Sequence, residues 1–247
     1  MGDAGVVLVT GAGGAIGSAA VRAFLDAGYR VAALDVAPCV AEPEWEGYRG
    51  MVGDVRDPAA VARAVAEAGR MGPLQHVVEI AGGALPEEPP TQDDPTLLSV
   101  EGFRASVELN LTSHFVVLRA ALPERRRHPG AARSLTLTSS WNALTGCGMP
   151  AYSAAKAGLI GMMHALVPPL GREGIRVNVV APGTVRTPRT ERIWAGDAGH
   201  WERLEASTAL GRLGTPGDVA RAFVALAGLA HVTGQVLVVD GGQMVKR

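Results

Sequence analysis

A tyrosine and a lysine that are four positions apart carry the clearest chemical signal in the sequence. Tyr152 and Lys156 fall in a segment with helical spacing, so both side chains are expected on one face of a helix. A tyrosine hydroxyl with a pKa of about 10 is a poor acid or base at neutral pH, and a nearby ammonium group lowers that pKa. The chain has only two lysines and three tyrosines, so a chance pair at this spacing is rare. The pair therefore predicts a proton donor or acceptor for the oxygen of an alcohol or a ketone.

A serine hydroxyl is expected beside this pair. Ser139 lies thirteen residues before Tyr152, at the end of an apolar strand. The carboxyl ends of parallel strands border the crevice in which ligands bind. Ser139 is therefore expected to hydrogen-bond the substrate oxygen, and Ser140 is the alternative. Trp141 and Asn142 follow directly and are expected to line the substrate pocket, with plain packing as the alternative.

A glycine-rich turn follows the first apolar segment of the chain. Glycines between a strand and a helix let backbone N–H groups approach a pyrophosphate, and the helix N-terminus adds a partial positive charge. The turn alone is a weak indication, because glycine is abundant here, at 32 residues. Its place between an apolar strand and a helical segment favours dinucleotide binding. The candidate contacts are Gly11, Gly13, Gly14, Ala15, Ile16 and Gly17.

Two aspartates at the ends of later strands are candidate cofactor contacts, and the first of them indicates which dinucleotide binds. Asp35 ends the segment Arg30–Asp35, where a carboxylate can accept hydrogen bonds from the adenosine ribose and repel the 2′-phosphate of NADP. No arginine or lysine lies in the glycine turn or directly after Asp35, so NAD(H) is favoured over NADP(H). Asp54 follows the short run 51–53, and it can either reach the adenine edge or cap the helix that begins near Pro58.

The order of elements along the chain predicts the fold class. Apolar runs of strand length alternate with segments of helical spacing, which is typical of βαβ units. We expect an α/β fold, a single-domain doubly wound parallel sheet of the Rossmann type with helices on both faces, over residues 1–247. The expected strands are Gly5–Thr10, Arg30–Asp35, 51–53, Leu74–Ile80, Ser134–Ser139, Ile175–Val180 and Gln235–Asp240. The expected helices are Ala15–Ala27, Pro58–Gly69, Val100–Leu122, Pro150–Leu170 and Pro216–Gly228.

Local signals refine these elements. Asp57 and Thr215 each precede a proline at the start of a helix and are expected to be N-caps. Pro168 and Pro169 are expected to bend or end their helix, because proline removes backbone donors. Residues 184–208 contain few candidate core residues and are expected to form a lid over the substrate.

The composition excludes several classes of function. A formal net charge of −1 gives nucleic acid and anionic membranes no electrostatic attraction. No apolar stretch is long enough to cross a membrane, and a cytoplasmic location is expected. Cys39 and Cys147 lack the spacing of a metal site or a disulfide framework and are expected to be reduced thiols. The expected partner is a small alcohol or ketone, without a metal ion.

Together these motifs resemble those of the short-chain dehydrogenase/reductase family, in its single-domain branch, over nearly the whole chain. TGAGGAIG resembles TGxxxGxG, Ser139 with Tyr152 and Lys156 matches Ser…YxxxK, and Asn110 in ELNLTSHF matches the asparagine of the catalytic helix. The resemblance implies that Ser139 positions the substrate and that Tyr152 is the general acid/base. It also implies that Lys156 binds the nicotinamide ribose and that Asn110 holds a water that relays protons. Further cofactor contacts implied by it are Val55, Ala81, Gly82, Pro182, Gly183 and Thr187.

The same resemblance implies an NAD(H)-dependent oxidoreductase that interconverts a secondary alcohol and a ketone, and a homotetramer or homodimer. Two departures leave other functions open: Ala15 replaces a family glycine, and Glu79-Ile80 replace two asparagines. A nucleotide-binding protein without turnover, or a non-redox dehydratase or cyclase, is the alternative. Glu79 is expected to be a paired structural carboxylate rather than a charge at the cofactor cleft, because buried carboxylates need partners.

Overall fold

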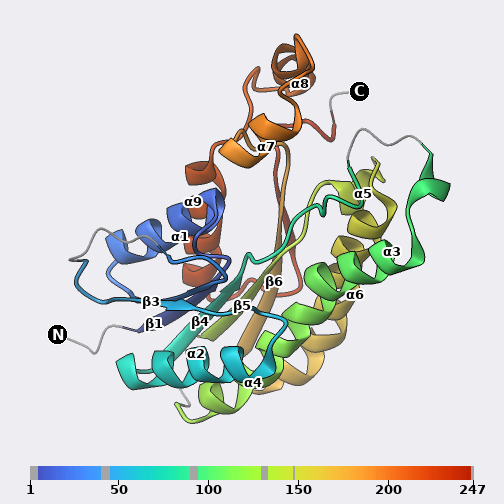
Figure 1. The fold of residues 1–247 in the computed structure, drawn as a ribbon. Coiled ribbons are helices and arrows are strands. Elements are labelled where there is room, and N and C mark those ends of the chain that lie inside the picture. Colours follow the sequence, from blue (N-terminus) through green and yellow to red (C-terminus); the bar gives the residue numbers. More distant parts are fainter. Residues whose placement is uncertain (1–4, 40–44, 90–93, 129–132, 147, 246–247) are drawn as a thin grey trace.

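The computed structural model describes residues 5–39, 45–89, 94–128, 133–146 and 148–245. The strands in these residues are β1 Val6–Thr10, β2 Arg30–Asp35, β3 Tyr48–Val52, β4 Leu74–Glu79, β5 Arg133–Thr138, β6 Ile175–Pro182 and β7 Val236–Val239. They form one sheet in the order β3-β2-β1-β4-β5-β6-β7, and every neighbouring pair is parallel (Figure 1). The strand order reverses between β1 and β4, which is where a doubly wound sheet opens its ligand crevice.

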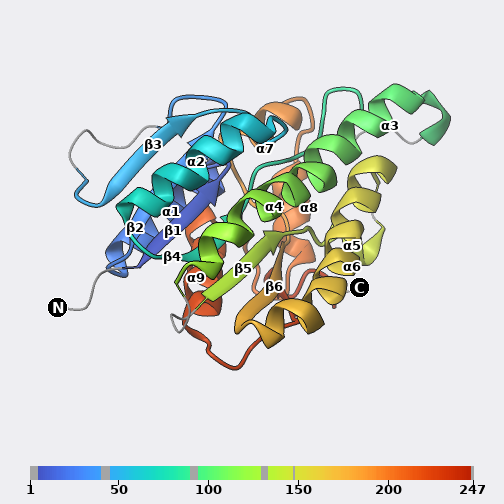
Figure 2. The same cartoon turned by 90° about the horizontal axis from the view of Figure 1, so that it is seen from below.

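Helices cover both faces of this sheet (Figures 1 and 2). The helices are α1 Ala15–Asp26, α2 Pro58–Met71, α3 Val100–Val107, α4 Ser113–Arg126, α5 Asn142–Thr145, α6 Pro150–Arg172, α7 Pro188–Ile193, α8 His200–Ser207 and α9 Pro216–Gly228. α1 and α9 pack on one face, and α2, α4 and α6 pack on the other. Among the described residues, no helix has both the length and the hydropathy that a bilayer crossing needs.

The alternation of side chains along the strands explains the two layers. Val7 and Val9 of β1 enter the apolar cluster under α1 and α9, whereas Val6 and Leu8 enter the cluster under α2, α4 and α6. All four side chains are fully buried. Because both faces of the sheet are covered, β1, β5 and β6 are buried along their whole length, and the expected α/β fold is confirmed.

The expected N-caps are confirmed as well. Oδ1 of Asp57 accepts a hydrogen bond from Ala59 N at 2.9 Å, and Oγ1 of Thr215 accepts one from Asp218 N at 3.1 Å. These two residues start α2 and α9, the helices that flank the sheet on its opposite faces.

One helical expectation is wrong, and a second is wrong in part. The single helix expected over 100–122 is divided by a π-helical turn, Glu108–Thr112, which separates α3 from α4. The helix α6 does not end at Pro168 and Pro169 but continues to Arg172, so the expected end is wrong and the expected bend stays a prediction. Leu170 explains the continuation: it is 3% exposed and packs into the core, so tertiary packing holds the last turn despite the missing backbone donors.

Candidate active site

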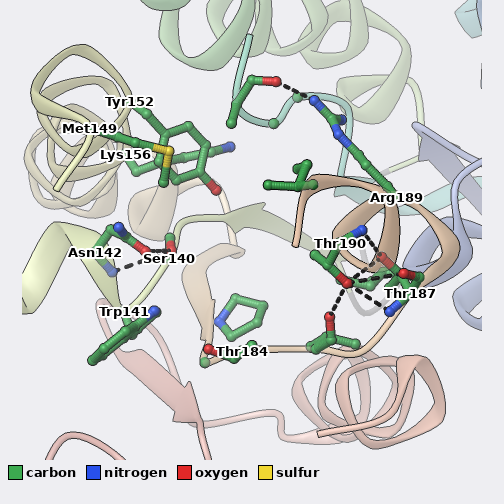
Figure 3. Close-up of a pocket in the computed structure, with 18 of the residues that line it drawn as sticks. Ser140, Trp141, Asn142, Met149, Tyr152, Lys156, Thr184, Thr187, Arg189 and Thr190 are labelled. Atoms are coloured by element: carbon green, nitrogen blue, oxygen red, sulfur yellow. Dashed lines mark hydrogen bonds between the residues drawn. The ribbon is translucent and has the colours of Figure 1, made fainter. Parts of the chain in front are cut away.

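A cavity of about 610 Å³ opens beyond the carboxyl ends of the central strands. Its walls come from the end of β5, the start of α6 and the segment that runs from β6 into α8 (Figure 3). Trp141 and Asn142, expected at the substrate pocket, both line it. The segment 184–208, expected to be a lid, contributes α7 and α8 beyond the end of β6 (Figure 1).

Tyr152 lies in the first turn of α6 and lines the cavity (Figure 3). Burial raises the pKa of its hydroxyl above the ordinary value, while a hydrogen bond with Ser140 and the charge of Arg189 oppose that rise. Lys156 follows one turn later, with Nζ 5.8 Å from the centroid of the Tyr152 ring. The helical spacing thus brings the phenol and the ammonium group to one cavity.

Lys156 is 2% exposed, and its Nζ donates to the backbone carbonyl of Thr138 at 2.8 Å. Burial lowers the pKa of Lys156 to about 7, and the negative charge of Glu79 acts in the opposite direction. A lysine whose pKa lies near neutrality can hold or release a proton under physiological conditions.

The two serines after β5 make different contacts. Oγ of Ser139 donates to the backbone carbonyl of Lys156 at 2.8 Å, so this hydroxyl ties β5 to α6. Oγ of Ser140 donates to Oδ1 of Asn142 at 3.0 Å, and Ser140 is also the hydrogen-bond partner of Tyr152. Both serines line the cavity, and Ser140, the alternative from the sequence, is the one that interacts with the Tyr152 hydroxyl. Which of the two hydroxyls binds the substrate oxygen stays a prediction.

Asn110 sits in the π-helical turn and is fully buried. Its Nδ2 donates to the carbonyls of Gly83 at 3.1 Å and Ser106 at 3.0 Å, and its Oδ1 accepts from Gly83 N at 2.8 Å. Gly83 belongs to the loop after β4 that lines the cavity. The side chain of Asn110 therefore anchors this loop, and its role in a proton relay stays a prediction. Single π-helical turns are frequent at functional sites.

A buried acid and a buried imidazole lie near Lys156. Glu79 is 1% exposed at the end of β4, and neither of its carboxylate oxygens has a hydrogen-bond partner in the described part of the chain. Burial raises the pKa of Glu79 well above its ordinary value, and the charge of Lys156 opposes the rise. Burial and the charge of Lys156 both lower the pKa of His114. Glu79 was expected to have a bonded partner, and this expectation is wrong: in the described residues its carboxylate makes no hydrogen bond. It interacts with Lys156 only through charge.

The glycine turn after β1 has the space that a dinucleotide requires. A Cβ at Gly17 would lie 1.9 Å from the carbonyl oxygen of Gly11, so only glycine lets α1 begin this close to the turn. Gly13 and Gly14 are exposed, and α1 has no side-chain N-cap, which leaves its first N–H groups open to an anion. Asp35 borders the turn from β2, and its Oδ2 accepts from Gly13 N at 3.0 Å. These residues fit a nicotinamide dinucleotide.

Asp54 has a different partner from those considered in the sequence. Its carboxylate binds Arg56, with Nη2 and Oδ2 2.6 Å apart, and this hydrogen bond lowers the pKa of Asp54. The helix α2 is capped by Asp57 instead, so the capping alternative for Asp54 is wrong. Val55 is 5% exposed and packs in the core.

The remaining cofactor candidates lie around the same cleft. A Cβ at Gly11 would meet the backbone N of Ala81 at 2.6 Å, so the glycine turn packs directly on the loop after β4. Thr187 is the N-cap of α7, where its Oγ1 accepts from Thr190 N at 3.2 Å. Besides Tyr152 and Lys156, five of the predicted cofactor contacts line the cavity: Ile16, Gly82, Pro182, Gly183 and Thr187.

Sequence reasoning missed several residues at the site. Arg189 of α7 donates to the carbonyl of Ala84 and thereby joins the segment after β6 to the loop after β4 (Figure 3). His200 of α8 lines the cavity and stacks on Trp194, with ring centroids 4.0 Å apart. Glu88 lies against the start of α6. These residues belong to no motif, and only the tertiary fold brings them to the site.

The described residues offer few side chains for metal binding or thiol chemistry. The described residues contain no group of three or more His, Cys, Asp or Glu side chains placed to hold a metal ion. Cys39 is a free thiol, and burial raises its pKa. Cys147 lies outside the described residues.

Comparison with known proteins assigns this geometry to a family. The family model described as enoyl-(acyl carrier protein) reductase matches residues 11–244. The chain is 35% identical to L-fucose dehydrogenase of Mus musculus, over 96% of this chain and 87% of that protein. It is 36% identical to L-rhamnose 1-dehydrogenase (NAD(P)(+)) of Sphingomonas sp. strain SKA58, over 97% and 96%.

A solved structure agrees with these relatives. The crystal structure of an oxidoreductase of the short-chain dehydrogenase/reductase family from Burkholderia thailandensis is 35% identical to this chain and has a TM-score of 0.86. The match covers 98% of this chain and 93% of that one. The protein therefore belongs to the short-chain dehydrogenase/reductase family.

Proposed function

We propose that this enzyme oxidises a hydroxyl on a ring carbon of a sugar to a carbonyl, with NAD⁺ as the hydride acceptor. The observation that carries the proposal is the Tyr152 phenol in the cavity wall, hydrogen-bonded to Ser140 and close to Lys156. The sugar as substrate is supported by the relatives, which include dehydrogenases of L-fucose and L-rhamnose.

Side chains of the cavity account for substrate binding, proton removal and stabilisation of the phenolate. A nicotinamide held beside Lys156, Gly183 and Thr187 would supply the acceptor for the hydride of the carbinol carbon. The Ser140 hydroxyl holds the substrate oxygen next to Tyr152, and the Tyr152 phenolate removes the hydroxyl proton. The ammonium group of Lys156 favours the phenolate, because an opposite charge nearby stabilises it. Asn110 keeps the loop after β4 in place against this site.

The walls of the cavity suit a sugar ring. Trp141, Met149 and Trp194 supply apolar surface for the C–H faces of the ring, and Asn142 and Thr190 supply polar groups for its hydroxyls. Residues 184–208 carry Trp194 and Thr190, so closure of this segment would exclude water from the reacting atoms.

The test is an assay of the purified enzyme with NAD⁺. The panel contains L-fucose, L-rhamnose and an acyclic β-hydroxyester, which is the contrasting class of oxidisable alcohol. NADH formation on a sugar, lost by about a hundredfold or more in Tyr152→Phe with NADH binding retained, is the expected result. Conversion of a sugar without any change in NADH would instead favour a non-redox reaction. NADH binding without turnover on any member would favour a binding protein.

The preference for NAD⁺ is proposed from Asp35. Its carboxylate accepts hydrogen bonds from the backbone N of Gly13 and of Ala37, each at 3.0 Å, which fixes a negative charge where the adenosine ribose would lie. Asp35→Ser should weaken NADH binding and reduce the ratio of NADPH to NADH dissociation constants by roughly tenfold. Fluorescence titration of both nucleotides measures this, and an unchanged ratio would remove Asp35 from that role.

A further inference from the structure

Glu88 is a buried carboxylate that no step of the proposed function uses. It lies in the loop between β4 and α3 and is 3% exposed. Its Oε1 accepts a hydrogen bond from Ala151 N at 2.6 Å, and its Oε2 accepts one from Tyr152 N at 2.9 Å. A side chain from a distant part of the sequence thus binds the backbone of the tyrosine that performs proton transfer.

The start of α6 needs this carboxylate because it has no cap of its own. Met149 is the N-cap, and its side chain makes no capping hydrogen bond. Its φ of +47° makes it the one non-glycine residue in the described part of the chain with positive φ. Pro150 follows, and the next two N–H groups, of Ala151 and Tyr152, are those that an N-cap side chain normally satisfies. Glu88 satisfies both from another segment, with a charge that suits a helix N-terminus.

The same carboxylate also reaches the helix that leads to Asn110. Oγ of Ser106 donates to Oε2 of Glu88 at 3.4 Å, and the carbonyl of Ser106 accepts from Nδ2 of Asn110 at 3.0 Å. Ser106 and Asn110 are both fully buried. One buried group therefore connects the backbone of Tyr152 on α6 with the turn that holds Asn110.

We infer that Glu88 is a positioning residue that fixes Tyr152 and Asn110 relative to each other. The inference rests on the proposed function only in giving Tyr152 the proton-transfer step. Without Glu88, the N–H groups of Ala151 and Tyr152 lose the carboxylate that binds them, and the phenol shifts away from Ser140. Reaction rates are sensitive to such shifts, because general acid/base catalysis requires aligned groups. The glycine turn and Asp35 are separate from this contact, so NADH binding is retained.

Kinetics with a matched control test the inference. Glu88→Gln and Glu88→Ala are compared with Glu87→Gln, which alters an exposed carboxylate next in the chain. With the preferred sugar, kcat should fall roughly tenfold in Glu88→Gln and about a hundredfold in Glu88→Ala. KM and the number of NADH-binding sites should stay within about twofold of the parent, as in Glu87→Gln. If kcat falls only as much as the fraction of enzyme molecules that bind NADH, the inference is overturned. The loss would then reflect unfolded enzyme, and Glu88 would serve stability alone.

A second readout does not depend on turnover. Tyrosinate absorbance during a pH titration follows the three tyrosines of the chain, and Tyr152→Phe identifies the step that belongs to Tyr152. In Glu88→Gln this step should move to lower pH. The released ring gains water, and burial is the largest cause of its raised pKa, so this loss outweighs the loss of the Ser140 contact that lowers the pKa. An unmoved step overturns the inference. If the Tyr152 step moves but the protein oxidises no sugar, the inference is retained and the proposed function is rejected.

Ser106→Ala tests the connection to Asn110 separately. It leaves the two backbone hydrogen bonds of Glu88 intact and removes only the hydroxyl between α3 and the carboxylate. We expect a several-fold loss of kcat that is smaller than in Glu88→Gln. If Glu88→Ala does not fold, Glu88→Gln and Ser106→Ala carry the test, and parental kcat in both overturns the inference.

Discussion

Glu79 and Lys156 are a pair of buried groups whose charges depend on each other. Burial lowers the pKa of Lys156 to about 7, and an ionised Glu79 opposes that decrease. Glu79→Gln removes the negative charge with little change in shape, so the pKa of Lys156 should fall further. The alkaline limb of the pH profile of kcat should then move to lower pH, because the neutral amine no longer stabilises the Tyr152 phenolate.

A pH–rate series on Glu79→Gln, with Glu87→Gln as the exposed control, measures this shift. If the alkaline limb does not move, Glu79 of the parent enzyme is already protonated in that pH range and carries no charge to remove. Burial, which raises the pKa of Glu79, favours this protonated form.

The residues of the site differ in how far the sequence predicts them. The shared face of Tyr152 and Lys156 follows from helical spacing, which tolerates errors in where the helix begins. The choice between Ser139 and Ser140 does not, because neighbouring side chains at a strand end point to opposite sides. The strand was expected to end at Ser139 and ends at Thr138; beyond it, Ser139 binds the carbonyl of Lys156, and Ser140 lies beside Tyr152.

At the scale of elements, the junction of β1 and α1 depends on one glycine. A Cβ at Gly17 would lie 1.9 Å from the Gly11 oxygen and 2.7 Å from its carbonyl carbon. Gly17→Ala should push α1 away from the turn, lower the free energy of unfolding by about 2 kcal/mol or more and weaken NADH binding at least tenfold. Thermal unfolding and NADH fluorescence titration measure the two effects.

Gly14 provides the matched control for this junction. It precedes α1 with a φ of −74°, and a Cβ there would meet only the Gly11 oxygen, at 3.4 Å. Gly14→Ala should therefore leave stability nearly unchanged. Equal losses in Gly14→Ala and Gly17→Ala would show that loop flexibility, rather than the close approach of α1, is what the glycines provide.

The π-helical turn marks the limit of prediction at this scale. The apolar spacing of residues 100–122 matches one continuous helix, because one extra residue in a turn changes the periodicity too little to detect. The turn nevertheless sets the direction of Asn110 toward Gly83. The order and type of elements were predictable, whereas the local irregularity that orients a site residue was not.

At the scale of the whole molecule, buried arginines gather at the amino ends of the strands, away from the cavity. Arg176 donates to the carbonyls of Leu226 and Ala227, each at 2.7 Å, at the end of α9. Arg133 donates to the carbonyl of Arg125 at 3.0 Å, at the end of α4. Helix C-termini carry partial negative charge, so these guanidinium groups stabilise helix ends that the sheet brings together. A sequence cannot show this, because the carbonyls come from segments far apart in the chain.

These cations have a consequence for stability in acid through His76. His76 is 1% exposed on β4, and its Nδ1 lies 2.8 Å from Oγ of Ser134. Burial lowers the pKa of His76 from 6.5 to about 3, and the charges of Arg125 and Arg176 add to the decrease. Between these two pH values the unfolded chain binds a proton that the folded protein excludes. The free energy of unfolding should therefore be intact above about pH 6.5 and fall by up to about 1.4 kcal/mol per pH unit below it.

His76→Gln removes this proton while a polar side chain still faces Ser134. The free energy of unfolding of this variant should depend less on pH between about 6 and 4 than that of the parent. When both free energies are plotted against pH, they should differ most at neutral pH, where the parent is the more stable. Urea unfolding at a series of pH values measures both slopes. His231→Gln, at an exposed position, is the control and should follow the parent. If His76→Gln keeps the parental slope, the imidazole is not what limits the fold in acid, and the buried arginines would have to be tested in its place.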